Sequence, residues 1–184
     1  FDFCENFEFF GQNPKGFEAT NSKSLSQRLF ELRIRLAQVL RMEQDESIKA
    51  YAEELIQFVA KQTQALNPDS FIVRQHLRVV EKYRDANAWN HLSDLDIREI
   101  FEHIAPLISE TDEDELAKRF DAIMLDMQLY TILSDRRYVK LMDQVKGIAR
   151  KLTKKASIPA VQSKMDILRD IQHPEYWEDM GIIG

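Results

Sequence analysis

The sequence predicts an all-α chain of about seven main helices in one or two packed bundles, with an extended N-terminal segment. Apolar residues recur every three to four positions through most of the 184 residues, which is the spacing of amphipathic helices. Strand-like alternation is confined to Phe1, Phe3, Phe7 and Phe9. The five glycines are too scattered for a phosphate-binding loop or a dinucleotide-binding fingerprint.

The composition excludes several classes of protein. A formal net charge of -6 argues against a module that binds nucleic acid through bulk positive charge. Because Cys4 is the only cysteine, no intramolecular disulfide can form; this is typical of a reducing cytoplasm, and a cytoplasmic location is expected. No stretch approaches roughly 18 uninterrupted apolar residues, so no membrane span and no membrane partner are expected.

A linker precedes the first helices. Residues 11–22 are rich in Gly, Asn, Pro and Ser, as linkers are. The period then changes to that of a helix. Helices are predicted over about 24–42, with Ser22 or Ser24 as N-cap, and over about 46–65.

A third helix is predicted over about 68–84, with Asn67 as its N-cap and Pro68 at its first position. The side chains that this helix is expected to bury are Ile72, Val73, Leu77, Val80 and Tyr83. Residues 85–92 then form a loop with Trp89 as its large anchor.

Ser93 and Asp96 have the spacing of a capping box, so a fourth helix is predicted to begin there and to end at Pro106. The acidic run at 110–115 has two interpretations. It is a metal-binding or partner-binding patch, or it is the first turn of the next helix, where Thr111 caps and acids meet the positive end of the helix dipole. The second interpretation is preferred.

Three more helices are predicted over about 112–134, 136–155 and 158–172, the last beginning at Pro159. The short connection at 134–135 indicates an antiparallel return. The stripe expected to face inward from the first of these helices is Leu116, Phe120, Ile123, Met124, Met127 and Tyr130.

Candidate catalytic chemistry is sparse. The best metal candidate is His103 beside Glu99 and Glu102, although an edge position on a packed helix explains the same residues. Asp121 and Asp126 are a carboxylate pair, but five residues apart on a helix they point in different directions. That favours packing or hydrogen bonding over acid–base catalysis, and no catalytic, metal-binding or cofactor-binding residue is assigned.

Two groups of basic residues are candidates for contacts to phosphate groups. Arg74, Arg78 and Lys82 are spaced as one stripe of the third helix, which is also what a solvated face looks like. The second group, in a run without acidic residues, is Lys146, Arg150, Lys151, Lys154 and Lys155. Its alternative role is to place cations near a helix C-terminus, where they are favourable.

Several segments carry a family resemblance in sequence order. They are FDFCENFEFF with NPKG (1–16), LSQRLFELRIRL (25–36), FIVRQHLRVVEKYR (71–84), AKRFDAIMLDMQL (117–129), KGIARKLTKKASIPAV (146–161) and IQHPEYWEDM (171–180). They resemble the C-terminal part of R subunits of type I restriction enzymes, within the DEAD/DEAH-type translocase superfamily. None of these segments alone has the specificity of a nucleotide-binding motif, and Glu5 stands where the family commonly has Gly.

The resemblance implies a fragment of such a subunit. Residues 1–22 would be the exit strand and linker from an absent motor domain, 23–108 a first helical bundle, and 109–184 the C-terminal helical region. In the full subunit the motor uses ATP and Mg²⁺, and DNA is cleaved after translocation. This part is expected to be non-catalytic and to dock the motor onto the methyltransferase and specificity subunits. The alternative is a module that contacts duplex DNA through its basic helix faces.

Large aromatic residues in loops and tails are the candidates for that docking surface. They are Phe7, Phe9, Phe10, Trp89, Tyr176 and Trp177. The alternative is that the same side chains anchor their own segments locally.

Overall fold

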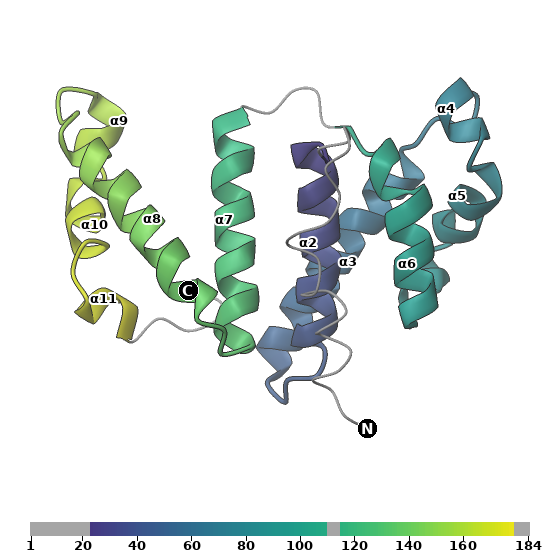
Figure 1. Ribbon diagram of the computed structural model, residues 1–184, viewed down its shortest axis with the longest axis horizontal. Coiled ribbons are helices and arrows are strands. Elements are labelled where there is room, and N and C mark those ends of the chain that lie inside the picture. The colour runs from purple at the N-terminus through teal and green to yellow at the C-terminus, as the bar shows by residue number, and fades with distance from the viewer. Residues whose placement is uncertain (1–22, 110–114, 179–184) are drawn as a thin grey trace.

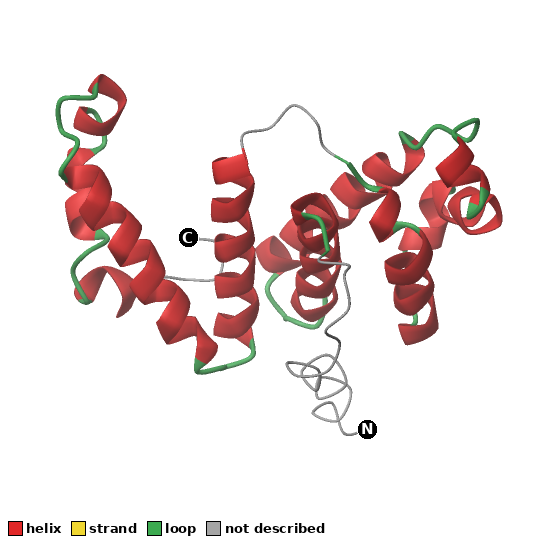
Figure 2. Cartoon of the chain, turned by 45° about the horizontal axis from the view of Figure 1, so that its top comes forward, coloured by secondary structure: helices red, strands yellow, loops and turns green. Residues whose placement is uncertain are grey.

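The computed structural model describes residues 23–109 and 115–178, and this part of the chain is all-α, without a strand (Figure 2). The helices stand side by side in a row, and this row runs along the long axis of the molecule (Figure 1). They are α2 Leu25–Leu40, α3 Glu46–Gln64, α4 Phe71–Arg74, α5 Leu77–Arg84, η1 Ala86–Trp89, α6 Asp94–His103, η2 Ala105–Leu107, α7 Glu115–Ile132, α8 Arg137–Thr153, α9 Pro159–Gln162, α10 Met165–Asp170 and α11 Glu175–Glu178. The predicted extended segment and most of the acidic run at 110–115 lie outside the described residues.

α2 is the centre of the larger hydrophobic core. Ser24 caps it, since the backbone N–H of Gln27 donates to Ser24 Oγ at 3.1 Å. α3, η2 and α7 all pack against α2, so its apolar side chains are buried on more than one side. Those with no exposed surface are Leu29, Phe30, Ile34, Leu36, Ala37 and Leu40.

The second predicted helix is also confirmed. α3 follows Asp45, whose side chain accepts from the backbone N–H of Ser47 at 2.7 Å and so caps the first turn. Ala52, Ile56 and Val59 of α3 enter the same core as α2.

The predicted third helix is wrong as one element. The chain leaves the helix at His76 (φ -117°, ψ 13°), which separates α4 from α5. Asn67 does not cap α4: its side chain accepts from the backbone N–H of Asp69 at 2.9 Å, in a turn that delays the helix start. Ile72 is exposed, against the prediction, and Leu77 is half-buried, whereas Val73, Val80 and Tyr83 are buried as expected.

The loop and the fourth helix follow the prediction closely. Trp89 ends the 3-10 turn η1 and is buried. Ser93 and Asp96 form the predicted capping box, with each side chain bonded to the other residue's backbone N–H. α6 ends at His103, and Pro106 lies in η2.

α7 packs on two sides, whereas the sequence predicted a single inward-facing stripe for this helix. Ala122, Leu125 and Leu129 join the core around α2, whereas Met127 faces α8 in a second core. Leu116 and Phe120, predicted to face inward, are exposed. α8 diverges from α7 toward the first turns of α7 (Figure 1).

The return between α7 and α8 is confirmed. Ser134 adopts a left-handed backbone conformation (φ 51°), and the backbone N–H of Asp135 donates to Tyr130 O at 2.9 Å. This is a helix-ending geometry that reverses the chain. α8 then returns at an angle to α7, as the two arms of a V.

The predicted seventh helix is also wrong as one element. Pro159 begins α9 as expected, but the backbone leaves the helix at Lys164 (φ -116°, ψ 12°) and restarts as α10. α10 packs along α8, and α11 closes the second core with Trp177. We call α8 to α11 (residues 137–178) the C-terminal arm. α7 contributes to both cores. The predicted division near residue 108 stays a prediction.

Candidate interaction surfaces

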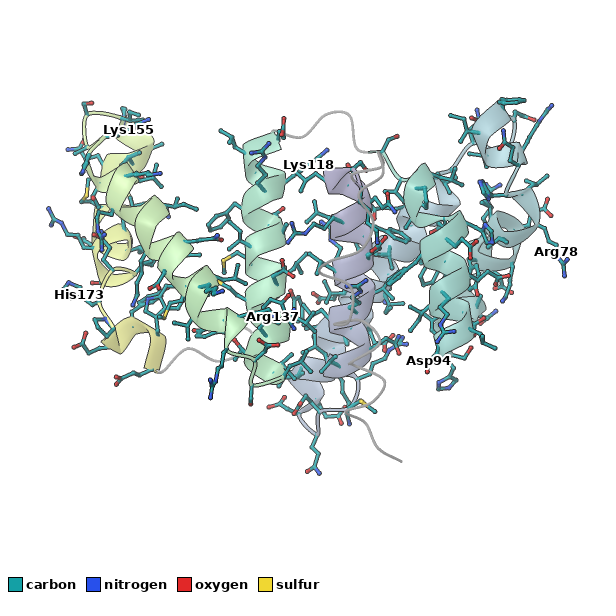
Figure 3. The ribbon with its side chains drawn as sticks, in the orientation of Figure 1. Arg78, Asp94, Lys118, Arg137, Lys155 and His173 are labelled. Carbon is teal, nitrogen blue, oxygen red and sulfur yellow. The ribbon has the colours of Figure 1, made fainter. Side chains whose placement is uncertain are left out.

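The first basic stripe is divided by the break at His76. Arg74 lies on α4 and Arg78 and Lys82 on α5, so the three cations do not follow one helix face. Lys82 Nζ lies 2.9 Å from Asp96 Oδ1 and 2.7 Å from Glu99 Oε2. Its charge is therefore matched within the fold. Arg74 Nη2 lies 3.5 Å from Asp69 Oδ1, whereas Arg78 is exposed and projects from this end of the molecule (Figure 3).

Lys82 belongs to a polar network that joins the end of α5 to the start of α6. The Tyr83 hydroxyl lies 2.8 Å from Asp96 Oδ1 and 2.9 Å from Glu99 Oε2. Hydrogen bonds from Ser93 and then Lys82 hold the pKa of Asp96 well below its usual range. Lys82 likewise lowers the pKa of Glu99, and the Glu99 carboxylate raises the pKa of Lys82. The network contributes to stability when both carboxylates are ionised.

We expect this network to weaken in acid. The folded pKa values of Asp96 and Glu99 lie below their unfolded values, which are about 3.9 and 4.3. Their contribution is therefore complete above those values and is lost as the pH falls through the folded pKa values. Asp96→Ala should lower the free energy of unfolding by about 1–2 kcal/mol at pH 7 and reduce its dependence on pH below about 5.

Urea unfolding between pH 7 and pH 3 measures both effects. Asp94→Ala, at an exposed neighbour in the same helical turn, is the matched control and should keep the acid dependence. Equal acid dependence in the Asp96→Ala and wild-type chains would contradict the role of this network.

The second basic run is exposed on the C-terminal arm. Arg150, Lys151, Lys154 and Lys155 are exposed and make no ion pair with any described residue. Residues 146–165 contain six lysines and arginines and no aspartate or glutamate. Lys146 differs, because its Nζ lies 5.9 Å from the Trp177 ring centroid and helps to cover that ring. Lys155 and Arg78 lie at opposite ends of the long axis (Figure 3), so the two basic groups cannot form one surface.

Most of the aromatic candidates for docking serve the fold. Trp89 is 2% exposed, so its predicted place on a docking surface is wrong. The Trp89 indole donates to Tyr83 O at 2.8 Å. Trp177 is also buried, and its indole donates to Ile171 O at 2.7 Å, while Tyr176 packs against it edge-on. Local anchoring therefore describes all three side chains. The other candidates, Phe7, Phe9 and Phe10, lie outside the described residues.

Two neighbouring apolar residues of α4 are exposed, which the sequence did not indicate. Phe71 is 78% exposed and Ile72 63% exposed, next to each other on this short helix at one end of the molecule. In the sequence, Phe71 and Ile72 belong to the apolar spacing that continues into α5. Periodicity alone therefore does not predict that they are exposed.

Asp126 has the packing role that was preferred for it. Its carboxylate is buried in the α2–α7 interface and lies 2.5 Å from Arg28 Nη2. Glu31 of α2 is also buried and pairs with Lys23 at 2.6 Å. Lys118 of α7 projects toward α2 between the two helices (Figure 3). Asp121 is exposed, so the two aspartates do not converge on a site.

His103 has a partner that its sequence neighbours did not indicate. Its Nδ1 lies 3.2 Å from Nδ1 of His76, which precedes α5. Glu99 instead belongs to the network around Lys82. In the described part of the chain, no group of three or more His, Cys, Asp or Glu side chains is placed to hold a metal ion.

Comparison with known proteins finds no matching family model, no matching curated protein and no matching solved structure. Within residues 23–109 and 115–178, none of the helices combines the length and apolar character needed to cross a membrane.

Proposed function

We propose that this chain is a non-catalytic assembly module, equivalent to the C-terminal helical region of a type I restriction enzyme R subunit. It docks an ATP- and Mg²⁺-dependent DNA motor onto a methyltransferase and specificity core. The support is the ordered resemblance of six segments, together with an all-α architecture in which α7 contributes to both cores. A row of packed helices suits a scaffold that holds larger parts at a distance.

The observation that carries the docking role is the exposed pair Phe71 and Ile72. Large apolar side chains next to each other on a surface are unfavourable in water and often mark an interface. Neighbouring buried residues Val73 and Val80 fix this end of the bundle. Burying two such side chains against a partner contributes about 1.5–3 kcal/mol each.

A binding assay between the chain and the purified methyltransferase–specificity complex tests this role. Phe71→Ser with Ile72→Ser should weaken the complex at least about tenfold, the equivalent of about 1.4 kcal/mol, and should leave Tm nearly unchanged because both side chains are exposed. Leu95→Ser is the matched control, since Leu95 is 73% exposed on α6. No association of the wild-type chain, or equal binding by the double variant, would contradict the proposal.

A second function is favoured by a separate observation: a module that contacts duplex DNA. The four exposed cations of the C-terminal arm have no anionic partner among the described residues. Exposed, unpaired lysines and arginines are the groups that bind phosphate with strong salt dependence. Loss of duplex affinity when these four charges are neutralised tests this candidate.

A further inference from the structure

His76 and His103 lie together at one end of the α5–α6 pair. His76 precedes α5 and His103 is the last residue of α6. At the other end of the same pair, Lys82 and Tyr83 bind the carboxylates of Asp96 and Glu99 on α6. The two imidazole rings lie with centroids 5.2 Å apart and planes tilted by 38°. Neither side chain is fully buried.

The Nδ1 atoms are 3.2 Å apart, and two arrangements have that separation. In a neutral pair, one Nδ1 carries a proton and donates it to the other. On a tetrahedral metal ion with metal–nitrogen bonds of about 2.0–2.1 Å, two imidazole ligands lie about 3.3–3.4 Å apart. The pair is thus within a few tenths of an ångström of the chelating distance.

We propose that His76 and His103 form a two-histidine site for a late first-row divalent cation, of which Zn²⁺ is the probe of choice. Imidazole nitrogen is a preferred ligand for these ions, and Nδ1 is one of its two ligating atoms. Both Nδ1 lone pairs bind the ion, and the proton of the donating Nδ1 moves to Nε2 of the same ring. No oxidation or reduction is involved.

The site is an accessory clamp rather than a structural zinc site. A structural site has four protein ligands, whereas the described residues place only these two side chains together and water completes the coordination. A bound ion ties the start of α5 to the end of α6. It therefore stabilises the end of the bundle that carries α4, with Phe71 and Ile72 exposed.

Titration of the chain with Zn²⁺ tests the site. We expect one ion per chain and a rise in Tm of at least about 2 °C at saturation. His76→Gln and His103→Gln should each lower the affinity at least about tenfold. His91→Gln and His173→Gln, at the two other histidines of the sequence, are the matched controls and should bind as the wild-type chain does. Mg²⁺ prefers oxygen ligands and should produce no shift.

Nitrogen-15 NMR of the wild-type imidazoles gives an answer that does not depend on how the variants fold. Zn²⁺ should move the Nδ1 resonances of His76 and His103 and leave His91 and His173 unaffected. Zn²⁺ binding that survives in both variants, or no movement of the two Nδ1 resonances at saturation, would overturn the proposal. The inference is independent of the docking and DNA-contact functions, because it depends only on these two side chains.

Discussion

Trp89→Ala is expected to lower the free energy of unfolding by about 3–5 kcal/mol, the range for removing a buried aromatic side chain. Trp89 is among the largest fully buried side chains, and its ring packs edge-on against Tyr83 with centroids 5.8 Å apart. Its indole also donates to Tyr83 O, and its own carbonyl accepts from Arg41. The truncation therefore opens a cavity and leaves an acceptor unpaired where α3, α5 and η1 meet.

Trp89→Phe separates these two effects. It keeps much of the ring volume but removes the donor, so we expect a cost of about 1–3 kcal/mol. Urea unfolding measured by circular dichroism gives both values. Trp177 becomes the only tryptophan in either variant, so its fluorescence reports the second core during the same experiment. A cost below about 1 kcal/mol for Trp89→Ala would contradict the anchoring role.

Helices whose stability comes from local pattern and capping were predictable from sequence. α2, α3 and α6 begin near the expected residues, because Ser24, Asp45 and Ser93 each accept from backbone N–H groups of the first turn. These signals lie within three residues of the helix start. A single sequence therefore carries all the information needed to place them.

The two broken helices were not predictable in the same way. Apolar spacing continues across both His76 and Lys164, so periodicity predicts one helix in each place. The structure shows nearly the same backbone step at the two residues, with φ near -117° and ψ near 13°. Each step redirects a short helix so that the next one packs on a distant partner: α5 on α3, and α10 on α8. Such tertiary packing overrides local propensity.

The same distinction between local signals and tertiary packing applies to the candidate surfaces. The partners of Lys82 are 14 and 17 residues away on another helix, and His76 is 27 residues from His103. Spacing along one helix cannot reveal either pair. That the cations of the C-terminal arm make no ion pair with a described residue was easier to predict. No acidic residue lies within 146–165 to pair with them locally.

Neutralising the free cations of the arm is expected to abolish most of any duplex binding. Arg150→Gln, Lys151→Gln, Lys154→Gln and Lys155→Gln together should lower affinity at least about a hundredfold at about 50 mM salt. If all four contact phosphate, the slope of log affinity against log salt concentration should become shallower by about 3–4. Fluorescence anisotropy with a labelled duplex, from low to physiological salt, measures both. Unchanged affinity, or no binding by the wild-type chain at low salt, would contradict this function.

The matched control removes the same charge from α3, α4 and α5, outside the C-terminal arm. Lys49→Gln, Lys61→Gln, Arg74→Gln and Arg78→Gln lower the formal net charge by four from -6, as the arm variant does. The long-range repulsion between an acidic chain and DNA therefore increases similarly in both. A loss of affinity limited to the arm variant assigns the contact to that surface, whereas equal losses would contradict a contact specific to the arm. Because the chain as a whole repels DNA, any binding must come from a local surface. The arm offers one, since its cations face solvent without acids beside them in the sequence.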